Sequence, residues 1–253
     1  MAAPIGLQLY TLRADAEKDY AATVRKVAEL GYVGVEPAGF PGTTAEAAGK
    51  LFQELGLQVP SLHIKLPLGD DKNEVLDTAG AVGAKRIVCP WQPPEDFSTE
   101  DRIKATCDTL NQAAAVAAEN GLQFAYHNHW FEYERVNGRY ANEIMLEYLD
   151  PSVLLELDTY WIKVGGQDPL QVIQQLGSRA PLLHIKDGPA DSRESDMVAV
   201  GQGVMDWHSI IPGAPNAEWL IVELDRCATD MMTAVAQSYE YLVGEGLARG
   251  NKN

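Results

Sequence analysis

Eight short apolar runs, spaced at fairly even intervals along the chain, constrain its fold more than any other feature. The runs are rich in Val, Ile and Leu, and longer stretches of helical composition separate them. This alternation is typical of parallel strands, because each parallel strand must be returned by a crossover connection. We expect the strands to begin near residues 5, 32, 59, 86, 122, 153, 181 and 219.

The helical stretches complete eight strand-then-helix units. They cover residues 19–30, 44–55, 70–82, 99–120, 139–149, 168–176, 206–211 and 229–243. Eight such units are the number in a (β/α)8 TIM barrel, and a doubly wound open sheet is the main competing architecture. Because no low-complexity stretch or Pro/Ser linker divides the chain, we expect residues 1–253 to form a single TIM-barrel domain.

The composition excludes some classes of partner. The chain carries 36 acidic and 20 basic side chains, a formal net charge of -16. Nucleic-acid binding requires a concentrated patch of Lys and Arg, and none is visible, so we expect no nucleic-acid partner. Three widely spaced cysteines are typical of reduced thiols in a cytoplasmic protein. We see no signal peptide and no apolar run long enough to span a bilayer, so we expect no membrane partner.

Polar side chains alternate with aliphatic ones along most of the predicted strands. Barrel strands must present apolar side chains to the helices outside, and successive side chains point to opposite faces. The titratable residues opposite the aliphatic face are Glu36, His63, Lys65, His127, Asp158, His184, Lys186 and Glu223. Each lies near the carboxyl end of its strand. We therefore expect them to converge on one mouth of the barrel, where TIM barrels place their active sites.

Two interpretations of this convergence are open. The residues form either a polar site for a ligand or metal, or a buried network of ion pairs that fills the top of the barrel. Burying several charges without a ligand or metal costs considerable free energy. This cost favours the first interpretation.

Four of these residues have the chemistry of metal ligands. Asp158, His184 and Glu223 offer carboxylate, imidazole and carboxylate from three successive strands, a mixture suited to Mn²⁺, Co²⁺, Mg²⁺ or Zn²⁺. His127 and His129 share one face of the fifth strand, and His127 has the position of a fourth ligand. The alternative for this pair is one core histidine and one surface histidine. A bound cation would polarise a substrate carbonyl while a nearby base moves a proton.

Short motifs spread over nearly the whole chain resemble those of the xylose-isomerase-like TIM-barrel family. They are Val35-Glu36-Pro37, Tyr126-His127-Asn128-His129, Leu157-Asp158-Thr159-Tyr160, Leu183-His184-Ile185-Lys186-Asp187, Gly201-Gln202-Gly203 and Val222-Glu223. The family includes sugar isomerases, ketohexose 3-epimerases, inosose dehydratases and the endonuclease IV group. The resemblance implies a TIM barrel with a divalent metal site.

The resemblance also implies roles for individual residues. In the epimerase and isomerase branches, Glu, Asp, His and Glu from strands five to eight typically hold the metal, and the two Glu residues act as acid and base. Asp158, His184 and Glu223 match the last three positions, with Glu223 also catalytic. His127 stands where the strand-five Glu is expected. Trp161 occupies the place of the His in the frequent Asp-Thr-x-His pattern.

The missing strand-five Glu requires another proton-transfer group. Glu132, His129 and His63 are candidates, and so is Lys186 if a metal and a dry pocket lower its pKa. Glu156 is in phase with the expected ligand of its own strand but sits one layer deeper. We expect a structural role for it.

Four residues are predicted to contact substrate: Glu36, His63, Lys65 and Trp161. Core packing is the alternative for Trp161, and neutralising Glu36 is the alternative for Lys65. In the last helix, Tyr239 and Tyr241 are candidates for a homo-oligomer interface.

These features predict a metal-dependent isomerase or epimerase that acts on a sugar, keto-sugar or cyclitol by abstracting a proton next to a carbonyl. The alternative within enzymes is a lyase of the inosose-dehydratase type. A barrel that binds a sugar without catalysis is the non-enzymatic alternative. The acidic charge and the five histidines argue against an abasic-site endonuclease.

Overall fold

Eight parallel strands form one sheet that curls into a barrel in the computed structural model, which describes residues 2–251. The strands are β1 (Ile5–Gln8), β2 (Gly34–Glu36), β3 (Leu62–His63), β4 (Arg86–Cys89), β5 (Gln123–His127), β8 (Leu154–Asp158), β9 (Leu182–Ile185) and β10 (Trp219–Val222). Their order in the sheet is β2-β1-β10-β9-β8-β5-β4-β3. The predicted (β/α)8 barrel is confirmed.

The two edge strands of this order, β2 and β3, face each other and nearly close the barrel. The backbone N–H of Val35 donates to the carbonyl of Gln58 at 2.9 Å, and the N–H of His63 donates to the carbonyl of Pro37 at 3.0 Å. Strand β3 is only two residues long, so these bonds to flanking backbone supply much of the closure. The predicted start of this strand near residue 59 is three residues too early.

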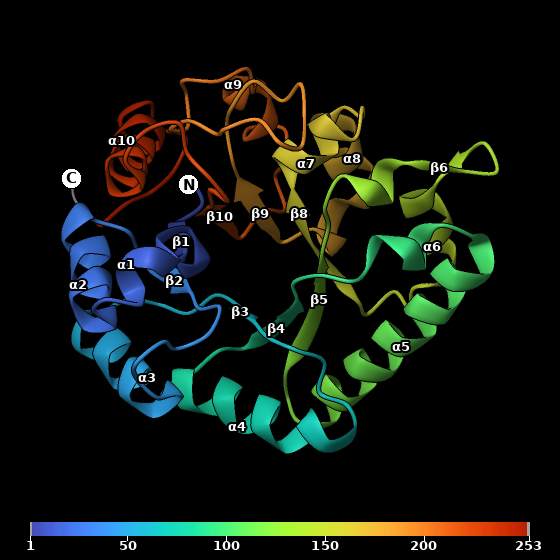
Figure 1. Ribbon diagram of the computed structural model, residues 1–253, viewed down its shortest axis with the longest axis horizontal. Helices are drawn as coiled ribbons and strands as arrows, with labels where there is room; N and C mark the ends of the chain where they lie inside the picture. The colour runs from blue at the N-terminus through green and yellow to red at the C-terminus, as the bar shows by residue number, and fades with distance from the viewer. Residues whose placement is uncertain (1, 252–253) are drawn as a thin grey trace.

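Helices surround the strands, as Figure 1 shows. They are α1 (Arg13–Ala16), α2 (Tyr20–Leu30), α3 (Ala45–Glu54), α4 (Lys72–Val82), α5 (Glu100–Glu119), α6 (Ala141–Tyr148), α7 (Thr159–Val164), α8 (Pro169–Leu176), α9 (Trp207–Ile210) and α10 (Met231–Gly244). Asp19, Thr44 and Thr99 accept hydrogen bonds from the first turns of α2, α3 and α5, which fixes where these helices begin. Within residues 2–251, no helix is long and apolar enough to cross a membrane.

Some short elements depart from the sequence-based expectation. The pair β6 (Arg135–Val136) and β7 (Arg139–Tyr140) forms a hairpin at the start of the stretch expected to be helical from residue 139. Three short helices begin at or shortly after strand ends at the mouth of the barrel. They are α7 and the 3₁₀ helices η1 (Leu9–Leu12) and η4 (Phe131–Tyr133). These short helices hold the strand ends at the mouth of the barrel.

The barrel interior changes from apolar to polar along its axis. Near the N-terminal ends of the strands, a Cβ on Gly34 would lie 2.9 Å from the ring of Trp219, so the indole fills the space that a side chain would need. Two residues further along β2, Glu36 is fully buried in a polar environment. The polar end of the interior is therefore closed below by packed apolar side chains.

The segment between β9 and α9 is the longest loop beside the mouth, and Asp187 organises it. Its carboxylate accepts hydrogen bonds from the backbone N–H groups of Gly188, Gly201 and Met205 and from the indole of Trp207, at 2.9 to 3.2 Å. Gly203 packs against the same carboxylate, where a Cβ would lie 2.1 Å from Oδ1. One buried carboxylate thus fixes a loop of about twenty residues.

Replacing Asp187 with Ala leaves these four donors without their acceptor. We expect the free energy of unfolding to fall by about 3 kcal/mol, because buried unpaired donors carry their full desolvation cost. Urea denaturation followed by circular dichroism measures the change. Asp191→Ala is the control on the same loop, since the exposed Asp191 contacts only the Ser195 hydroxyl. Equal midpoints for the two variants would contradict the role assigned to Asp187.

Candidate active site

The polar residues predicted from strand phase meet inside the mouth of the barrel. His127 ends β5, Asp158 ends β8, His184 lies in β9 and Glu223 follows β10. One ligand atom from each lies within 4.8 Å of the others, and no residue of the four is more than 4% exposed. The structure brings together all four residues predicted to hold a metal.

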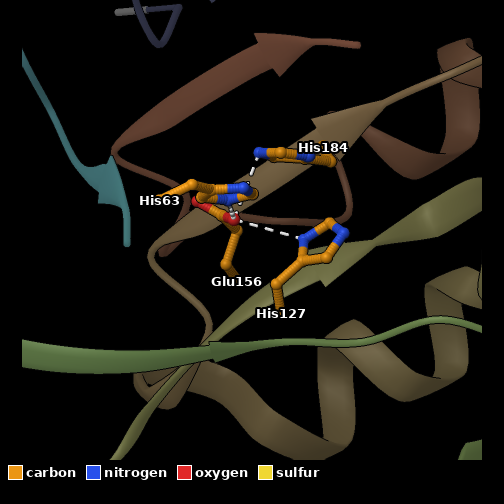
Figure 2. A group of neighbouring side chains, drawn as sticks. All are labelled: His63, His127, Glu156 and His184. Atoms are coloured by element: carbon orange, nitrogen blue, oxygen red, sulfur yellow. Dashed lines mark hydrogen bonds and ion pairs between the residues drawn. The ribbon is translucent and has the colours of Figure 1, made fainter. Parts of the chain in front are cut away.

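A second group lies beside the first and shares its two imidazoles. Its own members are His63 and two fully buried glutamates, Glu36 and Glu156, which we call the inner carboxylates. Figure 2 shows His63, His127 and His184 arranged around Glu156. Asp158 and Glu223 are called the mouth carboxylates. The site therefore has two pairs of carboxylates joined by histidines.

His184 bridges the two pairs with its two ring nitrogens. Nδ1 lies 2.7 Å from Oε2 of Glu223, and Nε2 lies 2.7 Å from Oε2 of Glu36. The ring is fully buried. Its orientation is therefore fixed by one mouth carboxylate and one inner carboxylate.

His127 spans the same two pairs more loosely. Its Nε2 lies 3.8 Å from Oδ2 of Asp158, and its Nδ1 lies 3.2 Å from Oε2 of Glu156. Nδ1 is buried and makes no hydrogen bond of good geometry, and Oε1 of Glu156 also has no partner. Buried polar atoms without a partner are costly in a folded protein and point to a ligand or ion that completes them.

The proton distribution in this cluster follows from its carboxylates. Burial alone would lower the pKa of His63 and His184, but Glu36 and Glu156 outweigh burial and raise both pKa values. Burial opposes the ionisation of Glu156, yet the same two imidazoles hold its pKa well below the usual range. Burial and the neighbouring His184 lower the pKa of His127 to about 3. His127 is thus neutral and keeps a lone pair for a metal.

Lys186 is the only lysine or arginine among the buried side chains of residues 2–251. Its Nζ lies 2.9 Å from Asp158 Oδ2, 2.8 Å from Glu223 Oε2 and 2.7 Å from Asp225 Oδ2. Burial alone would lower the pKa of Lys186, but the three carboxylates raise it well above its usual value. Paired in this way Lys186 is a fixed cation, and the base role, which required a metal to lower its pKa, stays a prediction.

The turn after β5 positions the remaining residues of the fifth-strand motif. Glu132 is 1% exposed and accepts hydrogen bonds from the hydroxyl of Tyr126 at 2.5 Å and the backbone N–H of His129 at 2.9 Å. The side-chain oxygen of Asn128 accepts from the backbone N–H of Asp158 at 3.0 Å. Glu132, predicted to be catalytic, therefore lies within the turn and holds His129.

A cavity of about 390 Å³ opens over the cluster. Its lining residues are Tyr10, Ala38, His63, Pro90, Trp91, His127, His129, Glu223 and Asp225. Pockets that bind small molecules commonly have this size and combine apolar walls with a few polar groups. The predicted residues His63, His127, His129 and Glu223 all reach it.

Two of the predicted substrate-binding residues lie elsewhere. Strand β3 ends at His63, so the chain has left the barrel at Lys65, whose half-exposed ammonium pairs with Asp71 at 2.6 Å and Glu74 at 3.0 Å. The structure therefore places Lys65 outside the site. Trp161 is 3% exposed, and its ring lies under the ammonium of Lys186 at 5.4 Å instead of lining the cavity.

Strand phase did not distinguish Glu36 and Glu156, which do not line the cavity, from the residues that do. Glu36 accepts hydrogen bonds from the amide of Gln8 at 2.7 Å and from the hydroxyl of Ser61, and it faces His184 instead of the cavity. Glu156, expected to be structural, lies 2.5 Å from His63 Nε2. The phase that Glu156 shares with Asp158 could have marked it as a residue of the site. Its contact with His63, from a distant strand, was not visible in the sequence.

The family model for the xylose isomerase-like TIM barrel matches residues 24–242. The chain belongs to this family. Its barrel is 27% identical over 260 aligned residues to the inosose dehydratase of Geobacillus kaustophilus (strain HTA426), covering 85% of this chain and 82% of that protein. The confirmed family agrees with the resemblance found in the sequence.

Solved structures show the same architecture. A sugar phosphate isomerase/epimerase from Parabacteroides distasonis ATCC 8503 is 28% identical, with a TM-score of 0.83 over 97% of this chain and 99% of that chain. A structure described as IOLI protein with a binding zinc atom is 16% identical, with a TM-score of 0.71 over 95% and 97% of the two chains. At that identity the second comparison shows the fold alone.

The residues of this xylose isomerase-like barrel fit a divalent cation. Two carboxylates and two imidazoles are the ligand types that Mn²⁺, Co²⁺ and Zn²⁺ accept, whereas Mg²⁺ prefers oxygen alone. Oδ2 of Asp158 receives no hydrogen bond of good geometry, although Lys186 lies 2.9 Å away. His127 Nε2, which faces it, is bonded to no described residue. Asp158 Oδ2 and His127 Nε2 are thus free to hold a cation, whereas His184 Nδ1 and Glu223 Oε2 bond to each other at 2.7 Å and would have to exchange this bond for the cation.

Glu132 gives the site a measurable pH dependence. Burial raises its pKa from 4.5 to about 7, so between these values the folded chain holds a proton at this carboxyl that the unfolded chain has lost. The contribution of Glu132 to the free energy of unfolding is therefore full below pH 4.5. It is lost as the pH rises through 7, and the total loss is about 3 kcal/mol at most. Glu132→Gln should flatten this loss, measured as unfolding free energy between pH 5 and 8 without metal. An unchanged slope would contradict the raised pKa.

Proposed function

We propose that this protein is a divalent-metal-dependent enzyme that abstracts the proton next to a carbonyl in a sugar, keto-sugar or cyclitol. The observation that carries the proposal is the convergence of His127, Asp158, His184 and Glu223 within 4.8 Å beside a cavity. The zinc of the IOLI structure and the sugar and cyclitol names of the relatives support it. Isomerisation or epimerisation is the outcome that we favour.

His127, Asp158, His184 and Glu223 would hold a cation that, when bound, would polarise the substrate carbonyl and make the neighbouring C–H more acidic. The chain's own task is to hold substrate and move the proton. Glu223 lines the cavity, and Lys186 and His184 outweigh its burial to keep its pKa well below the usual range. An ionised carboxylate at this position can accept a proton from substrate.

His129 is the second candidate for proton transfer. Burial, followed by the nearby ring of His127 and the ammonium of Lys186, lowers its pKa well below 6.5, so the ring is neutral at physiological pH. Its Nδ1 makes no hydrogen bond, and the ring lines the cavity. Glu132 holds the backbone of His129 in place. We therefore assign His129 and Glu223 to proton transfer and Glu132 to positioning.

Dehydration is the second candidate function, and His127 is the observation that favours it. A histidine there removes the carboxylate that a two-glutamate epimerisation would use on the opposite side of the substrate carbon. A dehydratase needs one base for the C–H and one acid for the departing hydroxyl. The identity to an inosose dehydratase is consistent with this alternative.

Asp158→Asn tests the metal site. Asn keeps the volume but removes one negative ligand, so we expect Mn²⁺ binding to weaken on the order of 100-fold and activity to fall with it. Equilibrium dialysis of metal-free protein against Mn²⁺ measures the affinity. Asp77→Asn, on the exposed face of α4, is the matched control. The metal proposal is wrong if the reconstituted wild type binds no divalent cation and Asp158→Asn leaves activity unchanged.

Incubation in D₂O separates the two reactions. With candidate ketohexoses and inososes, incorporation of deuterium next to the carbonyl without net loss of water identifies epimerisation or isomerisation. Net loss of water identifies the dehydratase. His129→Gln should slow the exchange by about 100-fold or more, because it removes a proton-transfer group while keeping a polar side chain. Exchange at the wild-type rate would exclude His129.

Glu156→Gln tests whether the inner carboxylates position the metal-binding imidazoles. Each of His127 and His184 turns one nitrogen to a mouth carboxylate and the other to an inner carboxylate, which fixes the tautomer that faces the metal. We expect Mn²⁺ affinity to fall about 10- to 100-fold. Glu119→Gln, exposed on α5, is the control. Unchanged affinity in a folded Glu156→Gln protein would refute this role.

A further inference from the structure

Two exposed aromatic side chains share the cavity with the proposed catalytic residues. Among residues 2–251, the large exposed hydrophobic side chains are Tyr10 at 44%, Trp91 at 49% and Val204 at 52%. Tyr10 and Trp91 both line the cavity over the cluster. Aromatic rings left exposed beside a pocket are typical of binding sites, because their apolar faces stay in contact with water until a ligand covers them.

Tyr10 is held firmly in its exposed position. It lies in η1, directly after β1, where the side-chain oxygen of Gln8 accepts a hydrogen bond from its backbone N–H at 2.9 Å. The guanidinium of Arg13 lies 4.2 Å from the ring centroid and donates to the carbonyls of Tyr10 and Asp225. A ring fixed in this way loses little conformational freedom when a ligand binds.

Trp91 is held by the backbone that carries it. It follows β4 in the sequence Cys89-Pro90-Trp91-Gln92-Pro93-Pro94, where three prolines restrict the chain. Its carbonyl accepts a hydrogen bond from the thiol of Cys89 at 3.5 Å. The indole is half exposed but stands on a stiff segment. It therefore offers a preformed apolar surface at the edge of the cavity.

The charge of the cavity limits what can bind there. No lysine or arginine lines it, its carboxylates are Glu223 and Asp225, and the imidazole of His63 is already engaged by Glu156 at 2.5 Å. The ammonium of Lys186 is already engaged by Asp158, Glu223 and Asp225. A phosphate group requires cationic or N–H donors to replace its hydration. The cavity thus disfavours phosphorylated substrates, even though a relative is named a sugar phosphate isomerase/epimerase.

We propose that the substrate is uncharged and has two parts: a carbonyl-bearing polyol held over His127 and Glu223, and a linked ring with an apolar face that stacks on Trp91 and Tyr10. Such a ring is either a second sugar or an aromatic substituent, which share the same apolar stacking chemistry. This inference rests on the proposed function and deepens it by naming the substrate class.

Ligand binding to the intact protein tests the stacking surface without requiring turnover. The probes are D-glucose, D-glucose 6-phosphate, cellobiose and phenyl β-D-glucopyranoside, with dissociation constants from calorimetry or ligand-observed NMR. We expect the two-ring compounds to bind about tenfold more tightly than glucose, and glucose 6-phosphate to bind no more tightly than glucose. Preference for cellobiose alone indicates a second sugar, and preference for the phenyl glucoside alone indicates an aromatic substituent.

Variants assign the preference to the aromatic surface. Trp91→Ala should remove the tenfold gain for two-ring compounds while glucose binding stays the same, and Trp91→Phe should restore most of the gain. Val204→Ala is the control, because Val204 is equally exposed but does not line the cavity. The inference is overturned if glucose binds as tightly as the two-ring compounds, if glucose 6-phosphate binds best, or if Trp91→Ala changes no affinity. Failure of the proposed function would instead appear as absent metal binding or absent deuterium exchange.

Discussion

The arrangement of the site depends on burying carboxylates where few cations are available. Glu36, Glu156, Asp158 and Glu223 are at most 4% exposed, and Lys186 is the sole buried lysine or arginine of the described chain. Isolated carboxylates at this depth would be strongly destabilising. They are tolerated because histidines and one ammonium contact them from every side. The positions of His63, His127 and His184 follow from this requirement as much as from catalysis.

Strand β5 shows how one segment serves both the site and its support. His127 ends the strand and His129 lies two residues beyond it, and both line the cavity, whereas Tyr126 and Asn128 do not. Tyr126 donates to Glu132 and so closes the turn, and Asn128 bonds the backbone of Asp158 in both directions. Asn128, the residue between the histidines, therefore joins two strand ends, which keeps the neighbouring ligand positions at a fixed separation.

The eight strand-then-helix units predicted the barrel, and strand phase predicted the four converging ligands because a two-residue period leaves only two faces for each side chain. Phase says nothing about which strands lie opposite each other, so the contact between Glu156 and His63 across the barrel was not predictable. Phase also fails once a strand ends. Lys65 was assigned to the mouth because β3 was expected to continue, whereas the chain turns away after His63. Trp91 was not predicted because it lies beyond the end of β4, where strand phase no longer applies.

The charges at the mouth explain how this barrel accommodates His127, where the family resemblance led us to expect glutamate. Asp158 and Glu223 carry two negative charges, and the ammonium of Lys186 is also paired with Asp225, which is partly exposed. In the proposed function, Lys186 and Asp225 offset each other, and a divalent cation would balance the carboxylates of Asp158 and Glu223. A glutamate in place of His127 would add a negative charge beside the inner carboxylates, which already lack a permanent cation. The histidine at this position thus avoids a further negative charge in a site that already buries Glu36 and Glu156 in addition to Asp158 and Glu223.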